Sequence, residues 1–188
     1  MSARYKKEKA YQAINFFLAN TSCCNKKKTY KLLWYLDSEF FQRIGRGVTG
    51  FQYFAWKMGP VPTELHELID NPDAEFEEFF DIERRNIKGY ETITLIAKKE
   101  FDEKFFSRAE MNLMQQLAEQ FDMATGGEME DLTHREGTPW HQVWVVEGRR
   151  QKEIPFEYAV TLSNLSPQDK ETLVAIATDR EAFLANYR

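Results

Sequence analysis

The chain has 188 residues, of which 43% are hydrophobic and 14% aromatic, and its formal net charge is −5. This apolar content favours a folded core over disorder, and the acidic balance disfavours general nucleic-acid binding, which depends on neutralising phosphates. No segment approaches the roughly 20 apolar residues that span a bilayer, and no apolar signal region follows the N-terminus. Cys23 and Cys24 are the only cysteines and are adjacent, so they cannot form a disulfide framework. We therefore expect a cytoplasmic protein that makes no membrane contact.

Two helices are predicted at the start of the chain. From about residue 3 to 18, apolar side chains recur at helical spacing with charged residues between them. After a polar break, a second helix is expected from about 26 to 44, ended by Gly45 and Gly47, which supply left-handed backbone. Its apolar side chains nearly encircle it, so we expect it to be the central buried helix. The encircling residues are Tyr30, Leu33, Trp34, Leu36, Phe40 and Phe41.

An aromatic-rich segment over 48–58 comes next and closes with Gly-Pro-Val-Pro at 59–62. We expect it to be extended or partly helical and to be stopped by a rigid turn at those four residues. If it is extended, its rings cannot all face inward, because alternate side chains point to opposite faces. Exposed rings would then mark an interaction patch, whereas helices on both sides would bury them. A short helix is predicted over 63–69, with Pro62 near its first turn.

The remainder is predicted to be helical apart from one β-hairpin. Two apolar-alternating runs between residues 79 and 97 flank a turn near 86–89, a pattern typical of a hairpin. The expected architecture is mainly α, a single-domain helical bundle with a small β-hairpin or short antiparallel sheet. Four helices are expected after the hairpin. The first opens at Ser107 with a capping box to Glu110, and the second follows Gly126-Gly127 and ends near His134. The third opens at Thr138-Pro139-Trp140 and runs through Val146, and the fourth spans 166–186 after a Ser166-Pro167 cap.

No arrangement in the sequence predicts a catalytic or cofactor site. His134, Glu136 and His141 could in principle hold a metal, but a zinc deaminase also needs a Pro-Cys-x-x-Cys element, and here Trp140 follows Pro139. The structural alternative is that His134 hydrogen-bonds a turn and Trp140 fills the core. No phosphate-binding glycine loop or nucleophile elbow is present. We therefore expect no enzyme activity, no cofactor and no metal, and we interpret the scattered basic runs as solvated faces.

Two blocks of residues, in order, match a family pattern. The first block is Lys31-Leu32-Leu33-Trp34-Tyr35-Leu36-Asp37, then Gly45 with Val48-Thr49-Gly50, then Phe54 to Pro62 and Leu65; the second is Ser107 and Glu110 opening a helix, then Leu132-Thr133-His134-Arg135-Glu136-Gly137-Thr138-Pro139-Trp140. Together they resemble the Panacea domain, the SocA-like antitoxin family, which is phage-associated. The resemblance covers roughly 30–146 and suggests one such domain over 1–188.

The resemblance implies an antitoxin that neutralises a cognate toxin, encoded by a neighbouring gene, through direct protein–protein binding. The alternatives are a proteolytic adaptor that delivers a toxin to an AAA+ protease, and a phage or prophage accessory interaction protein. Direct nucleic-acid binding is not expected. The hairpin over 79–97 and the helix after Ser166 are the segments expected to vary with the partner.

Two sets of residues follow from this interpretation. Partner contacts are expected at Phe51, Tyr53, Trp56, Lys57, Pro60, Val61, Pro62, Glu64 and Leu65. Motif residues with an expected structural role are Trp34, Asp37, Gly50, Gly59, Thr133, His134, Glu136 and Trp140.

Overall fold

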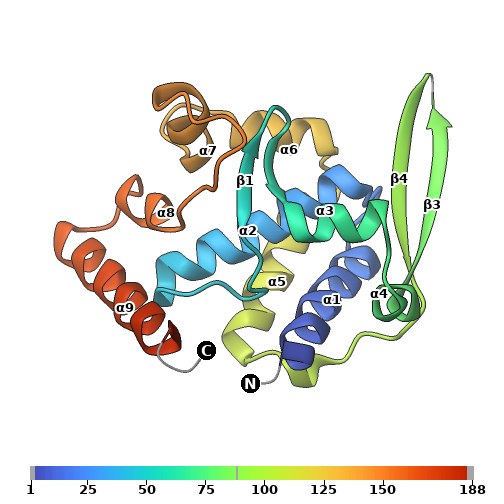
Figure 1. Cartoon of the computed structure of the whole chain (residues 1–188), viewed down its shortest axis with the longest axis horizontal. Helices are drawn as coiled ribbons and strands as arrows, with labels where there is room; N and C mark the ends of the chain where they lie inside the picture. The colour runs from blue at the N-terminus through green and yellow to red at the C-terminus, as the bar shows by residue number, and fades with distance from the viewer. Residues whose placement is uncertain (1–2, 88, 186–188) are drawn as a thin grey trace.

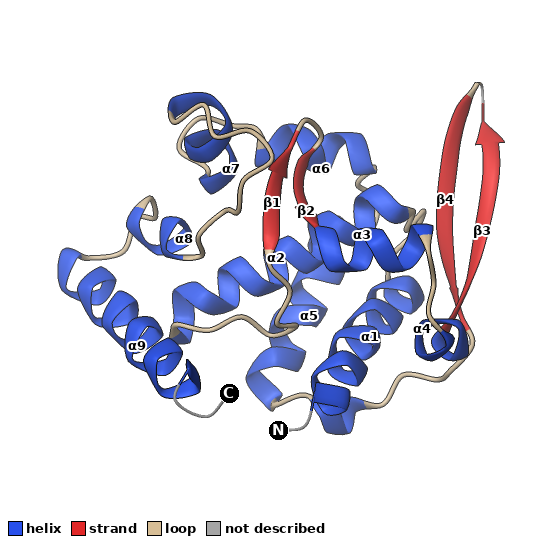
Figure 2. Cartoon of the chain, in the orientation of Figure 1, coloured by secondary structure: helices blue, strands red, loops and turns tan. Residues whose placement is uncertain are grey.

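A computed structural model describes residues 3–87 and 89–185. They form mainly helices with two antiparallel hairpins, which confirms the predicted fold class (Figures 1 and 2). The elements are α1 (Ala3–Asn20), α2 (Lys26–Ile44), β1 (Tyr53–Trp56), β2 (Gly59–Pro62), α3 (Thr63–Asp70), α4 (Ala74–Phe79), β3 (Phe80–Ile87), β4 (Tyr90–Ala97), a 3-10 turn η1 (Glu103–Phe105), α5 (Arg108–Phe121), α6 (Gly126–Thr133), α7 (Pro139–His141), a π-helical turn η2 (Gln142–Val146), α8 (Glu157–Thr161) and α9 (Pro167–Ala185).

Helix α2 lies at the centre of the fold, as predicted (Figure 1). It contacts α1, α5, α6, α8, α9, β2 and β4, and all six side chains expected to encircle it are buried. Asn25 caps its start by accepting a hydrogen bond from the backbone N–H of Lys28, and Gly45 ends it at a φ of +69°. Apolar side chains on every side of one helix therefore bring the other elements around it.

Two lysines of α2 are also buried. Lys28 is fully buried, and its Nζ donates to the carbonyl oxygens of Ser22 and Asp122, both at 2.7 Å. The expectation that the basic run Lys26–Lys28 is a solvated face is therefore wrong at its third residue. The reason is geometric: carbonyl groups that follow the ends of α1 and α5 lie within reach of this ammonium and replace its water.

The aromatic segment and the Gly-Pro-Val-Pro sequence form one hairpin. β1 pairs with β2 so that Tyr53 lies opposite Pro62 and Trp56 lies opposite Gly59. The prediction of a rigid turn at 59–62 is wrong: the chain reverses between Trp56 and Gly59, and 59–62 is the second strand. Prolines are tolerated there because β1 uses its other edge to bond with residues 151–154, which leaves β2 as an outer strand.

The second hairpin, β3–β4, projects from the helical body beside α3 and α4 (Figure 1). Its strands pair from Phe80 opposite Ala97 to Ile87 opposite Tyr90, which confirms the predicted hairpin over 79–97. Both strands contact the body: β4 touches α1 and α2, and β3 touches α4. Ile87 and Tyr90, at the free end, are 50% and 78% exposed.

The C-terminal part of the chain forms a small separate apolar cluster. Phe41 at the end of α2 packs with Val160, Leu173 and Ala177, which come from α8 and α9. The expected terminal helix is present as α9, and residue 186, its expected last residue, lies outside the described residues. Helices α4 and α8 were not predicted, because six and five residues are too few to show a helical period. In the part of the chain that the structure describes, no helix is both long and apolar enough to cross a membrane.

Candidate functional site

A buried lysine supports the turn between β1 and β2. The Nζ of Lys31, a residue only 1% exposed, donates to the carbonyl oxygen of Met58 at 2.6 Å and to that of Pro60 at 3.0 Å. Gly59 lies between them at a φ of +98°, and a Cβ there would stand 2.5 Å from this nitrogen and 2.8 Å from Oγ1 of Thr133. Glycine is therefore required at position 59 both by backbone conformation and by space.

The charge of this lysine is easily lost. Burial lowers the pKa of Lys31 to about 7, and the nearby carboxylate of Glu130 opposes the shift. A neutral amine still has two N–H groups, so both bonds to the carbonyl oxygens persist when the ammonium loses its proton. Lys31 is thus suited to holding the turn on either side of neutral pH.

The second motif block meets the same turn from the other side. Nε1 of Trp140 donates to the carbonyl oxygen of Trp56 at 2.8 Å, and His134 stacks on Trp140 with ring centroids 3.7 Å apart at 14°. Trp140 is 5% exposed, so the expectation that it fills the core is confirmed. The expected hydrogen bond from His134 to a turn is not found: its Nε2 is buried without a hydrogen-bond partner among the described residues. Stacking takes the place of that bond.

A buried carboxylate ties α2 to the loop that leads into β1. Asp37 accepts hydrogen bonds from the backbone N–H groups of Val48 at 2.6 Å and Thr49 at 2.8 Å, from the Thr49 hydroxyl, and from the Tyr53 hydroxyl at 2.6 Å. Burial raises the pKa of the Asp37 carboxyl, and these donated bonds oppose the rise. Every one of these partners is a donor from the chain itself, so the carboxylate holds this loop against α2.

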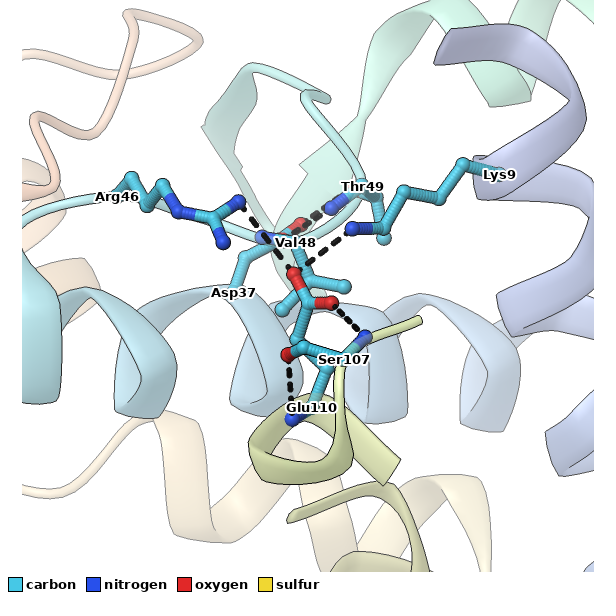
Figure 3. A network of polar contacts seen from close by, with 7 residues as sticks. All are labelled: Lys9, Asp37, Arg46, Val48, Thr49, Ser107 and Glu110. Carbon is cyan, nitrogen blue, oxygen red and sulfur yellow. Dashed lines mark hydrogen bonds and ion pairs between the residues drawn. The ribbon is translucent and has the colours of Figure 1, made fainter. Parts of the chain in front are cut away.

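A second buried carboxylate is tied to the same loop (Figure 3). Glu110 accepts a hydrogen bond from Lys9 at 2.7 Å and one from the backbone N–H of Ser107 at 2.7 Å, the latter as part of the predicted capping box, and it pairs with Arg46 at 3.4 Å. Through Arg46 it binds the same loop that Asp37 holds. The two carboxylates therefore connect α1, α2 and α5 to the segment preceding β1.

Most residues expected to contact a partner have buried side chains. In β1, strand alternation turns Tyr53 inward, and the side chains of Phe51, Pro60, Val61, Pro62 and Leu65 are buried as well. Three of the nine expected positions are accessible: Trp56 is half-buried, and Lys57 and Glu64 are exposed. The expected partner surface is thereby reduced to the turn and the start of α3.

Of the structural motif residues not yet placed, Trp34 is buried and Gly50 has a φ of +83°. Glu136 is exposed. No group of three His, Cys, Asp or Glu side chains among the described residues is placed to hold a metal ion.

The two cysteines differ in exposure. Cys23 is exposed, whereas Cys24 is buried, and burial raises the pKa of the Cys24 thiol.

A cavity of about 710 Å³ opens beside the turn. Its wall is built from the start of α2, the β1–β2 turn, α3, the start of β4 and the start of α6. Lys57, Trp56 and Tyr90 are among the residues that line it. Sequence reasoning did not find this cavity, because its wall combines stretches that are far apart along the chain, at 25–31, 56–66, 90–93 and 125–127.

Comparison with known protein families decides what kind of domain this is. The model described as "Antitoxin SocA-like, Panacea domain" matches residues 30–141, more than half of the chain. The chain belongs to this family. No curated protein and no solved structure matches the chain.

The Panacea match includes the residues that meet at the β1–β2 turn. Lys31 and Gly59 come from its first part, and Thr133 and Trp140 from its end. The two motif blocks, separated in sequence by α4 and the β3–β4 hairpin, are thus in direct contact in the fold. Residues from both ends of the matched range therefore brace the β1–β2 turn.

Proposed function

We propose that this protein is an antitoxin that neutralises a cognate toxin by direct binding. The observation that carries the proposal is the match to the SocA-like antitoxin family over residues 30–141. A binding role is also consistent with the side-chain inventory, because the buried carboxylates are occupied by donors from the chain itself. Such groups stabilise a scaffold and do not act on a substrate.

The β1–β2 turn is the surface that we expect to contact the toxin. Lys57 is exposed, Met58 is 52% exposed, and Trp56 is half-buried against the core. Aromatic and methionine side chains are enriched in protein interfaces. Because Lys31 and Trp140 hold the backbone of this turn from beneath, it would lose little conformational entropy on binding.

The free end of the β3–β4 hairpin extends the same surface. Tyr90 lines the cavity beside Lys57, so the two hairpin ends border one opening. A stable complex buries on the order of 1,600 Å² in total, more than one turn can supply. We therefore expect the toxin to span both hairpin ends and the cavity between them.

Co-expression with the product of the adjacent gene tests the proposal. The expected result is that the neighbour arrests growth alone, that this chain restores growth, and that the two proteins elute together in size-exclusion chromatography. A neighbour that is harmless alone, or growth rescue without a complex, would contradict direct neutralisation. Loss of the toxin protein only in cells that contain an AAA+ protease would instead favour the adaptor alternative.

A further inference from the structure

The cavity beside the β1–β2 turn has the size and lining of a binding site. Its volume of about 710 Å³ lies within the range of about 300–1,000 Å³ that is usual for ligand pockets. Apolar and aromatic side chains, among them Trp56, Met58 and Val61, form part of its wall. An occupant could therefore bury an apolar group there.

The wall of the cavity holds more lysines than carboxylates. The chain carries a formal charge of −5, yet four lysines and a single carboxylate, Glu91, line the cavity. That carboxylate lies 3.7 Å from Nη1 of Arg84, which offsets it. The lysines are Lys26, Lys27, Lys31 and Lys57. The local sign favours an anionic occupant.

Among the described residues, only one of these four lysines has neither an ion pair nor a side-chain hydrogen bond. Lys26 pairs with Asp70 at 2.9 Å, Lys27 pairs with Glu130 at 2.7 Å, and Lys31 bonds to backbone carbonyl oxygens. Lys57, which is exposed, has neither an ion pair nor a side-chain hydrogen bond within residues 3–87 and 89–185. One free cation at the rim matches a carboxylate, whereas a polyphosphate would need several.

The rings in the wall fit a side chain better than a nucleobase. Trp56 and His66 contact each other edge to face, with centroids 4.8 Å apart at 70°. The hydroxyl of Tyr30 lies 3.3 Å from Nδ1 of His66, so this ring nitrogen already has a hydrogen-bond partner. Trp56, His66 and Tyr30 thus meet edge to face and form a mixed apolar surface, which suits an apolar side chain.

From this geometry we infer that the cavity binds an acidic peptide segment of the toxin, with an aromatic or aliphatic side chain inside it and a carboxylate at Lys57. The inference rests on the proposed function and deepens it, since it names the part of the partner that is recognised. It also makes the partner's recognised segment acidic, although the net charge of −5 alone would favour a basic partner.

Direct binding of a model polypeptide tests the inference without the toxin. The probe is a fluorescein-labelled random copolymer of glutamate and tyrosine, followed by fluorescence anisotropy. We expect the wild-type chain to bind it more tightly than a glutamate homopolymer. Lys57→Glu should weaken binding by about tenfold, because it replaces the free cation with a carboxylate.

Lys6→Glu is the matched control. It makes the same charge change at an exposed lysine of α1, away from the cavity lining, and should leave the affinity unchanged. Equal binding by the Lys57→Glu variant would overturn the inference. So would displacement of the copolymer by inorganic phosphate or ATP at low concentration, or tighter binding of a single-stranded oligonucleotide, since either result would assign the site to another class of ligand.

Co-expression separates this inference from the proposed function. If the wild-type chain neutralises the neighbouring product and Lys57→Glu does so equally well, the antitoxin role stands and the acidic-segment inference fails. If the wild-type chain does not neutralise it, the antitoxin role fails. If the wild-type chain neutralises and Lys57→Glu does not, while Lys6→Glu does, both are supported.

Discussion

The amine of Lys31 lies 2.6 Å from the carbonyl oxygen of Met58, although the two residues belong to a central helix and to an exposed turn. This contact places a buried polar group directly beneath the surface that we expect to meet a partner. The rigidity of that surface therefore depends on α2, and changes at Lys31 should affect both stability and binding.

Replacing Lys31 with methionine should destabilise the fold by roughly 1–3 kcal/mol, because the carbonyl oxygens of Met58 and Pro60 then lose their donor inside the protein. The side chains are similar in length, so little space is lost. Urea unfolding followed by circular dichroism measures the change. Lys57→Met, at an exposed position, is the control and should stay within about 0.5 kcal/mol of wild type. Equal stability of the two variants would refute a structural role for Lys31.

The stability gap between wild type and Lys31→Met should widen as pH rises from 7 to 10. The pKa of Lys31 is about 7 in the folded protein and 10.5 in the reference state, so over this range the unfolded chain binds more protons than the native one. Stability due to this group then rises with pH, by at most about 1.4 kcal/mol per unit. Unfolding both proteins at several pH values measures the difference. A constant gap would show that Lys31 keeps an ordinary pKa.

Gly59→Ala should be much more destabilising than Gly137→Ala. Both glycines have positive φ, at +98° and +82°, so both substitutions cost about 1–2 kcal/mol of backbone strain. At Gly137 a Cβ would meet nothing within 4 Å, whereas at Gly59 it would collide with Nζ of Lys31 and Oγ1 of Thr133. Thermal melts of the two variants separate the collision from the strain. Equal melting temperatures would mean that Lys31 yields without cost.

Asp37→Ala should lower the free energy of unfolding by about 3–5 kcal/mol, since it leaves two backbone N–H groups and two hydroxyl groups buried without an acceptor. Asp37→Asn should cost less, because the amide oxygen still accepts hydrogen bonds and the hydroxyl groups can rotate to accept from the amide nitrogen. Guanidinium unfolding compares the variants.

Glu136→Ala provides the control for both Asp37 variants. Glu136 also belongs to the family motif but is exposed, so its removal should leave stability within about 0.5 kcal/mol. If Asp37→Ala were equally mild, the buried network would not be stabilising the loop before β1.

Local sequence signals predicted the longer helices and one hairpin well. Asn25 and Gly45 bound α2, Ser107 with Glu110 opens α5, and alternation marks β3–β4, and each of these signals acts within a few residues. The same reasoning missed that 59–62 is a strand, because its pairing depends on β1 being bonded on its other edge by residues 151–154.

By itself, the sequence determined that the chain is mainly helical, that α2 lies at the centre, and that two ordered motif blocks identify an antitoxin-like family. Only the tertiary structure decided which motif residues face outward, and it buried most of those expected to meet a partner. It also decided the environment of Lys31 and the cavity beside Lys57, since their partners come from segments far apart in the chain. Periodicity reports which face of an element is apolar, whereas the neighbours of that face are set by how the elements pack.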